Sequence, residues 1–173
     1  MDAAYQVQSR SISSIMLDSK NFKMIIENTP LVSIDLCIVC DSQILLGKRE
    51  NEPLKGVWFT PGGRILKNET WQDCLRRVAS SELSLEVRDP NEFRLMGVWD
   101  HFYKNSALDE AMSTHYVNLP HCICMKKKPN VKSDEQHEAI GWFDLHEVAS
   151  NAGFHEYMQN YASWLIKADT NND

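Results

Sequence analysis

The chain has 173 residues, of which 43% are hydrophobic and 24% charged, and its 18 Lys and Arg against 24 Asp and Glu give a formal net charge of -6. This composition indicates one globular domain that is large enough to bury a core. The negative charge disfavours nucleic acid as a main partner, because binding to phosphate backbones needs a basic surface. A small phosphorylated ligand held by a local group of arginines remains compatible with it.

Neither a membrane helix nor a secretion signal is expected. No apolar run approaches the roughly 20 residues that a membrane-spanning helix needs, and the polar N-terminal stretch lacks the apolar core of a signal peptide. The five cysteines follow no disulfide-framework spacing, which favours buried thiols. We therefore expect a cytoplasmic protein with a flexible lead-in at 1–17, a single domain at 18–168 and a disordered tail at 169–173.

In chain order, the first predicted elements are a helix and a β-hairpin. Ser19 is a candidate N-cap for a helix over residues 20–27. Residues 31–40 and 44–49 are rich in β-formers and flank a polar turn, which predicts the two strands of the hairpin. Further along, Pro61-Gly62-Gly63 predicts a tight turn, because glycine adopts dihedral angles that other residues avoid.

The rest of the chain alternates helices and strands. The predicted elements are a helix over 70–85, strands over 93–103, 114–125 and 139–143, a helix that starts at Asp144, and a final helix over 154–168. The last helix repeats Tyr157, Tyr161, Trp164 and Leu165 at helical spacing, which predicts core packing. Strands with helices between and after them predict an α/β fold, a mixed sheet covered on both faces.

The predicted helix over 70–85 carries one carboxylate on its apolar side. Its apolar stripe consists of Trp71, Leu75, Val78 and Leu85. Glu82 falls within this stripe, where a carboxylate is costly unless it has a partner. The partner is predicted to be either a metal ion near the glycine turn or a buried arginine, Arg64 or Arg77. A backbone carbonyl of the turn is a suitable second ligand for a hard cation such as Mg²⁺.

This stretch resembles the Nudix box, G-x5-E-x7-R-E-U-x-E-E-x-G-U, in which U is an apolar residue. The matching positions are Gly63, Glu69, Arg77 and Glu82. The departures are Val78 and Ser81, which replace glutamates, and Ser84, which replaces a glycine. A typical Nudix pyrophosphatase uses these glutamates to hold several Mg²⁺ ions and drive water onto phosphorus. The missing carboxylates therefore indicate either lost activity or a chemistry that needs less metal.

The chain is also similar, over roughly residues 17–145, to a branch of the Nudix family that lacks these glutamates, the GDP-mannose mannosyl hydrolases. The segments that carry the resemblance are TPLVSID (29–35), LLGKR (45–49), WFTPGGR (58–64), GVWDHFY (97–103), STHY (113–116) and DEQH (134–137). The resemblance implies the Nudix fold, a mixed β-sheet sandwiched between helices, and a homodimer.

The same resemblance implies a mechanism. One Mg²⁺ ion, replaceable by Mn²⁺, would be held by the Gly62 carbonyl, Glu82 and Gln136. His137 would be the general base for attack of water on the anomeric carbon of GDP-mannose or GDP-glucose. GDP would leave with inversion at that carbon. The unperturbed pKa of histidine, near 6.5, suits a base at neutral pH.

Further residues are implied in catalysis or in binding of the sugar and the diphosphate. They are Arg49, Arg64, Asp35, His101, Tyr116 and Arg77. The two first-named arginines can form forked hydrogen bonds with phosphate. Asp is disfavoured in mid-strand, so Asp35 is either a satisfied structural carboxylate or a group that faces the sugar. His101 would, without the resemblance, be a satisfied strand histidine, and Arg77 is expected mainly to orient carboxylates such as Glu69.

Three functions follow from these observations. The first is the GDP-sugar hydrolase, and the second is a nucleotide-sugar pyrophosphatase that releases a nucleoside monophosphate and a sugar 1-phosphate. The third is an inactive Nudix binding module. Val78 and Ser81 count against the second, and the combined retention of Glu82, Gln136 and His137 counts against the third. The loop over 104–112 departs from the branch pattern and leaves mannose, glucose or a deoxy sugar open.

Overall fold

The computed structural model describes residues 18–131 and 137–169. Within them, eight strands form one mixed sheet in which β3, β2, β1, β7 and β5 are neighbours in that order. The strands are β1 (Leu31–Cys40), β2 (Gln43–Arg49), β3 (Trp58–Phe59), β4 (Gly62–Arg64), β5 (Arg94–Leu95), β6 (Trp99–Tyr103), β7 (Thr114–Cys124) and β8 (His137–Asp144). The helices are α1 (Ser19–Asn28), α2 (Trp71–Leu83), the 3-10 helix η2 (Pro90–Glu92), α3 (Leu145–Ser150) and α4 (Glu156–Asp169).

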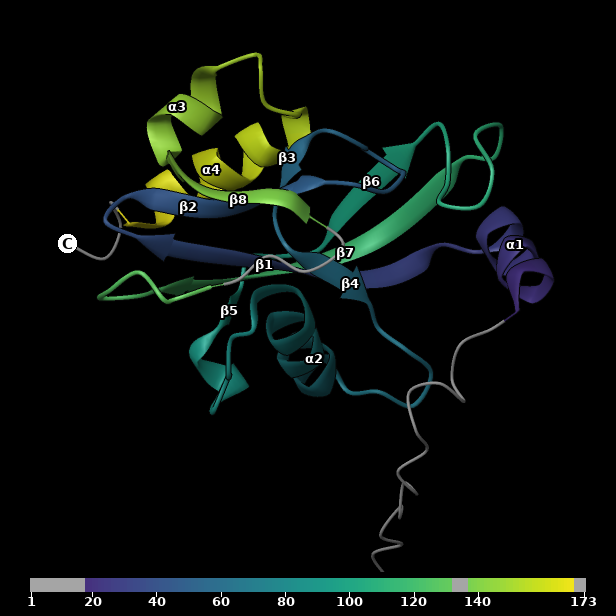
Figure 1. The fold of residues 1–173 in the computed structure, drawn as a ribbon, viewed down its shortest axis with the longest axis horizontal. Coiled ribbons are helices and arrows are strands. Elements are labelled where there is room, and N and C mark those ends of the chain that lie inside the picture. Colours follow the sequence, from purple (N-terminus) through teal and green to yellow (C-terminus); the bar gives the residue numbers. More distant parts are fainter. Residues whose placement is uncertain (1–17, 132–136, 170–173) are drawn as a thin grey trace, which may run out of the picture.

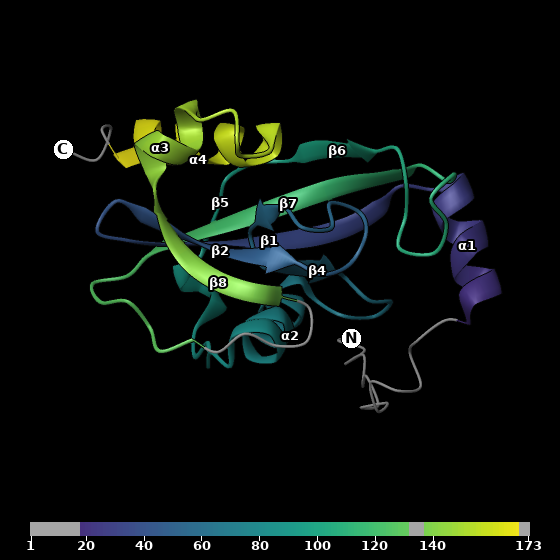
Figure 2. The ribbon, with the colours of Figure 1, turned by 45° about the horizontal axis from the view of Figure 1, so that its top comes forward.

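Helices cover both faces of the sheet, which confirms the predicted α/β/α layering (Figure 1, Figure 2). Alternate residues of β1 point to opposite faces. Ile34 and Leu36 pack in the core beneath α2, whereas Cys37 and Val39 pack in the core beneath α3 and α4, together with Tyr161. No helix in the described part of the chain is long and apolar enough to cross a membrane.

The pairing of β1 brings distant segments of the chain together. β1 runs parallel to β7, with Ser33 opposite Asn118, and antiparallel to β4, with Asp35 opposite Gly62. β2 continues the sheet on the other side and pairs with β8, where Arg49 lies opposite His137. Most of the predicted site residues therefore lie on strands that are hydrogen-bonded to β1 or to β2.

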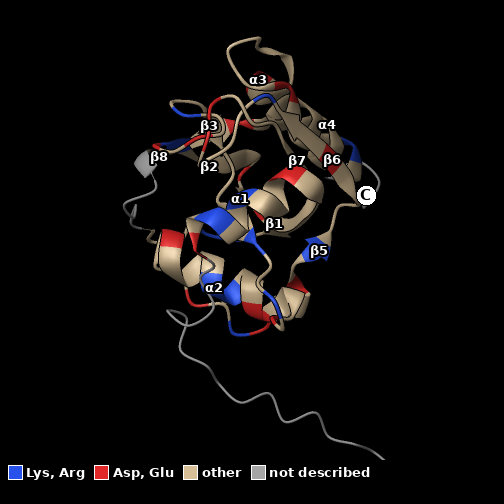
Figure 3. Ribbon diagram, turned by 90° about the vertical axis from the view of Figure 1, so that its right-hand side faces the viewer, with Lys and Arg blue, Asp and Glu red and all other residues tan. Residues whose placement is uncertain are grey.

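Helix α1 lies at one end of the molecule, beside the loop between β6 and β7 (Figure 1, Figure 2). Its apolar side, which includes Phe22 and Ile26, packs against Met112 and Tyr116. Lys23 forms an ion pair of 2.6 Å with Asp109 of that loop. Viewed from this end, α1 and α2 each carry basic and acidic residues (Figure 3).

Several local predictions differ from the structure. The side chain of Asp18, rather than Ser19, caps α1 by accepting from the backbone N–H of Asn21 at 2.9 Å. The strand predicted over 93–103 is two short strands, because Gly97 adopts a φ of 138° between β5 and β6. Helix α4 extends to Asp169, whereas the lead-in at 1–17 and the rest of the predicted tail lie outside the described residues.

Candidate active site

Gly62 is part of the short strand β4, and the predicted tight turn is wrong. The glycines with a positive φ in the described chain are Gly56 and Gly97, so Gly62 is not required for an unusual dihedral angle. It is required for space: a Cβ atom there would lie 2.3 Å from Oδ1 of Asp35 and 2.7 Å from the backbone oxygen of Ile34. The side chain of Asp35 thus lies directly against the Gly62 backbone.

Glu82 reaches the same glycine from helix α2. Its side chain is 3% exposed, which confirms the predicted burial, and its Oε2 accepts from the Gly62 N–H at 3.1 Å. Val78, at a position where the Nudix box has glutamate, is fully buried. A Cβ on Gly63 would lie 3.0 Å from its Cγ2. Methyl groups therefore occupy the space beside β4 that a second box carboxylate would need.

The residues at Gly62 carry oxygens of the types that a hard cation binds. Carbonyl and carboxylate oxygens are the ligands that Mg²⁺ prefers, and the Glu82 carboxylate lies against the Gly62 backbone, where it accepts from the N–H. Gln136, the third predicted ligand, lies outside the described residues. Among the side chains that the structure describes, no group of three or more His, Cys, Asp or Glu could hold a metal ion.

Arg77 forms hydrogen bonds with the segment that includes the end of β4 and the loop after it. Its Nε donates to Oε1 of Glu69 at 2.7 Å and its Nη2 donates to the backbone oxygen of Arg64 at 2.8 Å. Oε2 of Glu69 in turn accepts from the Leu66 N–H at 2.8 Å. Burial opposes the ionisation of Glu69, but these bonds outweigh it and hold the pKa of Glu69 below its usual value. Arg77 thus contacts the backbone of Arg64 and stabilises the loop.

Arg64 of β4 lies against α1, and its charge and that of Arg49 both act on Tyr116 of β7. The guanidinium carbon of Arg64 lies 3.9 Å from the centre of the Phe22 ring, and burial lowers the pKa of Arg64. Burial raises the pKa of Tyr116, while the positive charges of Arg64 and Arg49 oppose that rise. Nε of Arg49 donates to the backbone oxygen of Pro53 at 2.9 Å. The positive charges of two arginines therefore act on the phenol of Tyr116.

Asp35 belongs to a buried polar network with His101. Asp35 is 6% exposed, and burial raises its pKa to about 6 although Tyr161 and Asn118 donate hydrogen bonds to it. His101 is 1% exposed and stacks on Tyr157, with 3.8 Å between the ring centres. Burial lowers the pKa of His101 to about 4, so its ring is neutral at pH 7.

Two members of this network, Tyr161 and Asn118, were not predicted as site residues. Tyr161 was predicted to pack in the core, and it does so, but its hydroxyl also bonds Asp35 at 2.9 Å. Nothing in a helical apolar stripe signals that bond. Asn118 gave a usable signal, because Asn is as disfavoured in mid-strand as Asp. Asn118 in the middle of β7 is therefore as unusual as Asp35 in the middle of β1.

The structure describes the predicted base by its backbone alone, and it does not describe the predicted ligand Gln136. The backbone of His137 begins β8 directly opposite Arg49, whereas its side chain and all of Gln136 lie outside what the structure describes. The register therefore brings the backbone of the predicted base next to a predicted phosphate-binding residue.

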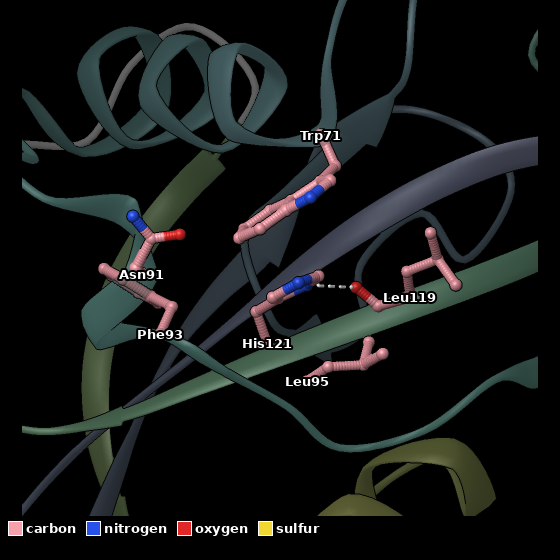
Figure 4. A pocket seen from close by; sticks show the side chains of 6 residues that line it. All are labelled: Trp71, Asn91, Phe93, Leu95, Leu119 and His121. Atoms are coloured by element: carbon pink, nitrogen blue, oxygen red, sulfur yellow. Dashed lines mark hydrogen bonds between the residues drawn. The ribbon is translucent and has the colours of Figure 1, made fainter.

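A hollow of about 360 Å³ lies apart from these residues (Figure 4). It is lined by Trp71, Asn91, Phe93, Leu95, Leu119 and His121. The rings of Trp71 and His121 stack with 4.8 Å between their centres, and Nδ1 of His121 donates to the Leu119 backbone oxygen at 2.8 Å. None of the predicted site residues lines this hollow, so the candidate site is not there.

The chain belongs to the Nudix family, since the family model described as NUDIX domain matches residues 30–165. Among curated proteins it is 37% identical over 144 residues to the low-salt glycan biosynthesis protein Agl8 of Haloferax volcanii, covering 83% of this chain and 87% of that one. It is 28% identical to an ADP-ribose pyrophosphatase of Methanocaldococcus jannaschii, over 85% and 80% of the two chains. A MutT NUDIX hydrolase from Burkholderia pseudomallei superposes with a TM-score of 0.64 at 26% identity, over 79% and 98% of the chains.

Proposed function

We propose that this Nudix hydrolase cleaves GDP-mannose or GDP-glucose to GDP and the free sugar, by attack of water on the anomeric carbon with inversion. The observation that carries the proposal is the burial of Val78 at a box glutamate position, beside Glu82 at Gly62. Attack on carbon needs no second metal ion to generate hydroxide at phosphorus. A site with one box carboxylate at the glycine strand suits that reaction.

The leaving group determines what the site must supply. The bond between the anomeric carbon and the β-phosphate oxygen breaks, and its electron pair leaves with GDP. Positive charge near the diphosphate lowers the barrier to this step. Arg49 and Arg64, which act together on Tyr116, are the cations proposed to hold the diphosphate. Mg²⁺, when bound by Gly62, Glu82 and Gln136, would neutralise part of the same charge.

The attacking water needs a base, and we assign this role to His137. Its neutral imidazole would accept a proton from water as the oxygen bonds to carbon. The pairing of His137 with Arg49 across β8 and β2 supports a base close to the diphosphate. Asp35 and Tyr116 are proposed to contact the sugar and the phosphates from the β1 and β7 side.

The names of two relatives support a sugar nucleotide as the substrate and also indicate the second candidate function. The name of the Haloferax protein refers to glycan biosynthesis, a setting that uses sugar nucleotides. The name of the Methanocaldococcus protein refers to pyrophosphatase activity, which favours attack at phosphorus as the second candidate. An inactive binding module is the third, and the buried bond between Glu82 and Gly62 counts against it.

Hydrolysis in ¹⁸O-labelled water with Mg²⁺ separates these candidates. We expect GDP-mannose to give GDP and mannose, with the label in mannose and with the inverted anomer formed first by ¹H NMR. GMP and mannose 1-phosphate, with the label in phosphate, would replace this proposal with the pyrophosphatase. Binding without turnover of any sugar nucleotide would favour the inactive module. GDP-glucose, a GDP-deoxy sugar and ADP-ribose complete the substrate panel.

Two substitutions test the assigned roles. Glu82→Gln should raise the Mg²⁺ concentration needed for half-maximal rate. His137→Ala should lower kcat at neutral pH by roughly 10²- to 10⁴-fold, the usual contribution of a general base. His146→Ala is the matched control, because His146 is exposed on α3 and should keep wild-type rates. Wild-type kinetics in both test variants would reject these roles.

The family resemblance also leads us to propose one metal ion per subunit and a homodimer. Isothermal titration with Mg²⁺ and then Mn²⁺ would measure the stoichiometry. Light scattering at several protein concentrations would measure the mass of the assembly. A monomeric mass that persists at high concentration, or two ions bound per chain, would contradict these proposals.

A further inference from the structure

The Asp35 carboxylate is held by donors from two elements that are far apart in the sequence. Oδ2 accepts from Nδ2 of Asn118 on β7 and from the hydroxyl of Tyr161 on α4 at 2.9 Å. Asn118 is 2% exposed and Tyr161 is fully buried. Hydrogen bonds to a charged group in a dry environment are strong and directional.

The two donors bind the same oxygen, which leaves the other one facing Gly62. Oδ1 lies 2.3 Å from the point where a Cβ on Gly62 would stand, so it rests over the glycine strand that Glu82 contacts from α2. With Oδ2 bound, the carboxylate cannot rotate without losing both bonds. The bonds to Oδ2 from Asn118 and Tyr161 therefore keep Oδ1 oriented toward Gly62.

The hydroxyl of Tyr161 is itself oriented by its neighbours. It accepts from Nδ2 of Asn118 at 3.1 Å and lies 3.3 Å from Nε2 of His101. A neutral His101 with its proton on Nε2 donates to this hydroxyl, which leaves the hydroxyl proton for Asp35. Nδ1 of His101 then accepts from the hydroxyl of Tyr103 at 3.3 Å. Each hydrogen bond in the series from Tyr103 through His101 and Tyr161 to Asp35 thus has a donor and an acceptor.

We propose that Tyr161 and Asn118 are positioning residues that orient the Asp35 carboxylate toward the substrate site at Gly62. The inference rests on the proposed function in that it takes Asp35 as a group that faces the sugar. It adds the C-terminal helix α4 to the site, although α4 is otherwise a packing element of the core. The ring of Tyr161 packs edge-on against Trp99 with 5.2 Å between the centres, so removal of the hydroxyl alone leaves that packing in place.

Tyr161→Phe tests the proposal, and Tyr157→Phe is its matched control. Both tyrosines lie on α4, but the hydroxyl of Tyr157 accepts from the Phe102 backbone N–H at 2.8 Å. With a sugar nucleotide that the wild type hydrolyses, Tyr161→Phe should lower kcat by about 10- to 100-fold, as displaced catalytic groups do, and change KM by less than about threefold. Tyr157→Phe should leave both nearly unchanged. In an Asp35→Asn background, Tyr161→Phe should have no further effect.

The alternative outcomes separate the two levels of the proposal. Equal effects of Tyr161→Phe and Tyr157→Phe, or an undiminished effect of Tyr161→Phe in the Asp35→Asn background, would overturn the positioning role. Failure of the wild type to hydrolyse any sugar nucleotide would overturn the proposed function instead. Crystal structures of the wild type and of Tyr161→Phe then decide the positioning role without activity. A rotated Asp35 carboxylate in the variant supports the role, and an unchanged one overturns it.

Discussion

Replacing Gly62 by alanine tests the close contact between β4 and β1. The new Cβ would lie 2.3 Å from Oδ1 of Asp35 and 2.7 Å from the backbone oxygen of Ile34. The second contact involves backbone in the middle of β1, so the strands must separate. We expect Gly62→Ala to lower the free energy of unfolding by about 3 kcal/mol or more, at or above the upper end of typical overpacking costs.

Urea denaturation of Gly62→Ala, with Gly63→Ala as the control, measures this cost. A Cβ on Gly63 would meet only Cγ2 of Val78 at 3.0 Å and Nη1 of Arg77 at 3.8 Å, so that control should lose about 1 kcal/mol or less. Adding Asp35→Ala removes one clash of Gly62→Ala and should recover only part of the loss. Equal losses at the two glycines, or a Gly62→Ala loss below about 0.5 kcal/mol, would refute the steric reasoning.

Three further predictions concern the surroundings of the site. Because the folded pKa of His101 is lowered to about 4, its stabilising contribution is complete above pH 6.5 and is lost as the pH falls toward 4; wild type should lose about 2 kcal/mol more than His101→Gln between pH 7 and pH 5 in urea titrations. Phe22→Leu removes the ring beneath Arg64 and should raise KM and the Ki of inorganic diphosphate by about twofold to fivefold; unchanged constants would exclude this contact from binding. Arg77→Gln should cost about 2 kcal/mol, and a double-mutant cycle with Glu69→Gln should show that the two losses are not additive.

The sequence predicted the layers of the fold well because they depend on local patterns. The ten-residue strand β1 and the hairpin to β2 followed from β-formers around a polar turn. The prediction failed where tertiary contacts decide the backbone. Gly62 and Gly63 indicated a turn, but pairing with β1 holds them in a strand, and no local signal reports a partner 27 residues away along the chain.

In the candidate site too, features that depend on local patterns could be predicted, and features that depend on tertiary contacts could not. Burial of Glu82 could be predicted, because helical periodicity places it among apolar residues. The donors to Asp35 could not be found from periodicity, since Asn118 and Tyr161 are 83 and 126 residues away from it. The bond from Arg77 to the Arg64 backbone also depends on the loop conformation after β4, which residue types do not specify.

The span between Asp35 and Tyr161 has a consequence for how the protein is made. Contacts between such distant residues form late, because the intervening chain must first be ordered. During synthesis, β1 emerges long before α4, so Asp35 lacks the hydroxyl of Tyr161 as a donor until α4 has left the ribosome. A stalled or clipped chain that lacks α4 would retain the sheet segments but leave this carboxylate less well bonded, at a cost to stability. Helix α4 thereby couples synthesis of the last helix of the domain to the complete hydrogen bonding of Asp35.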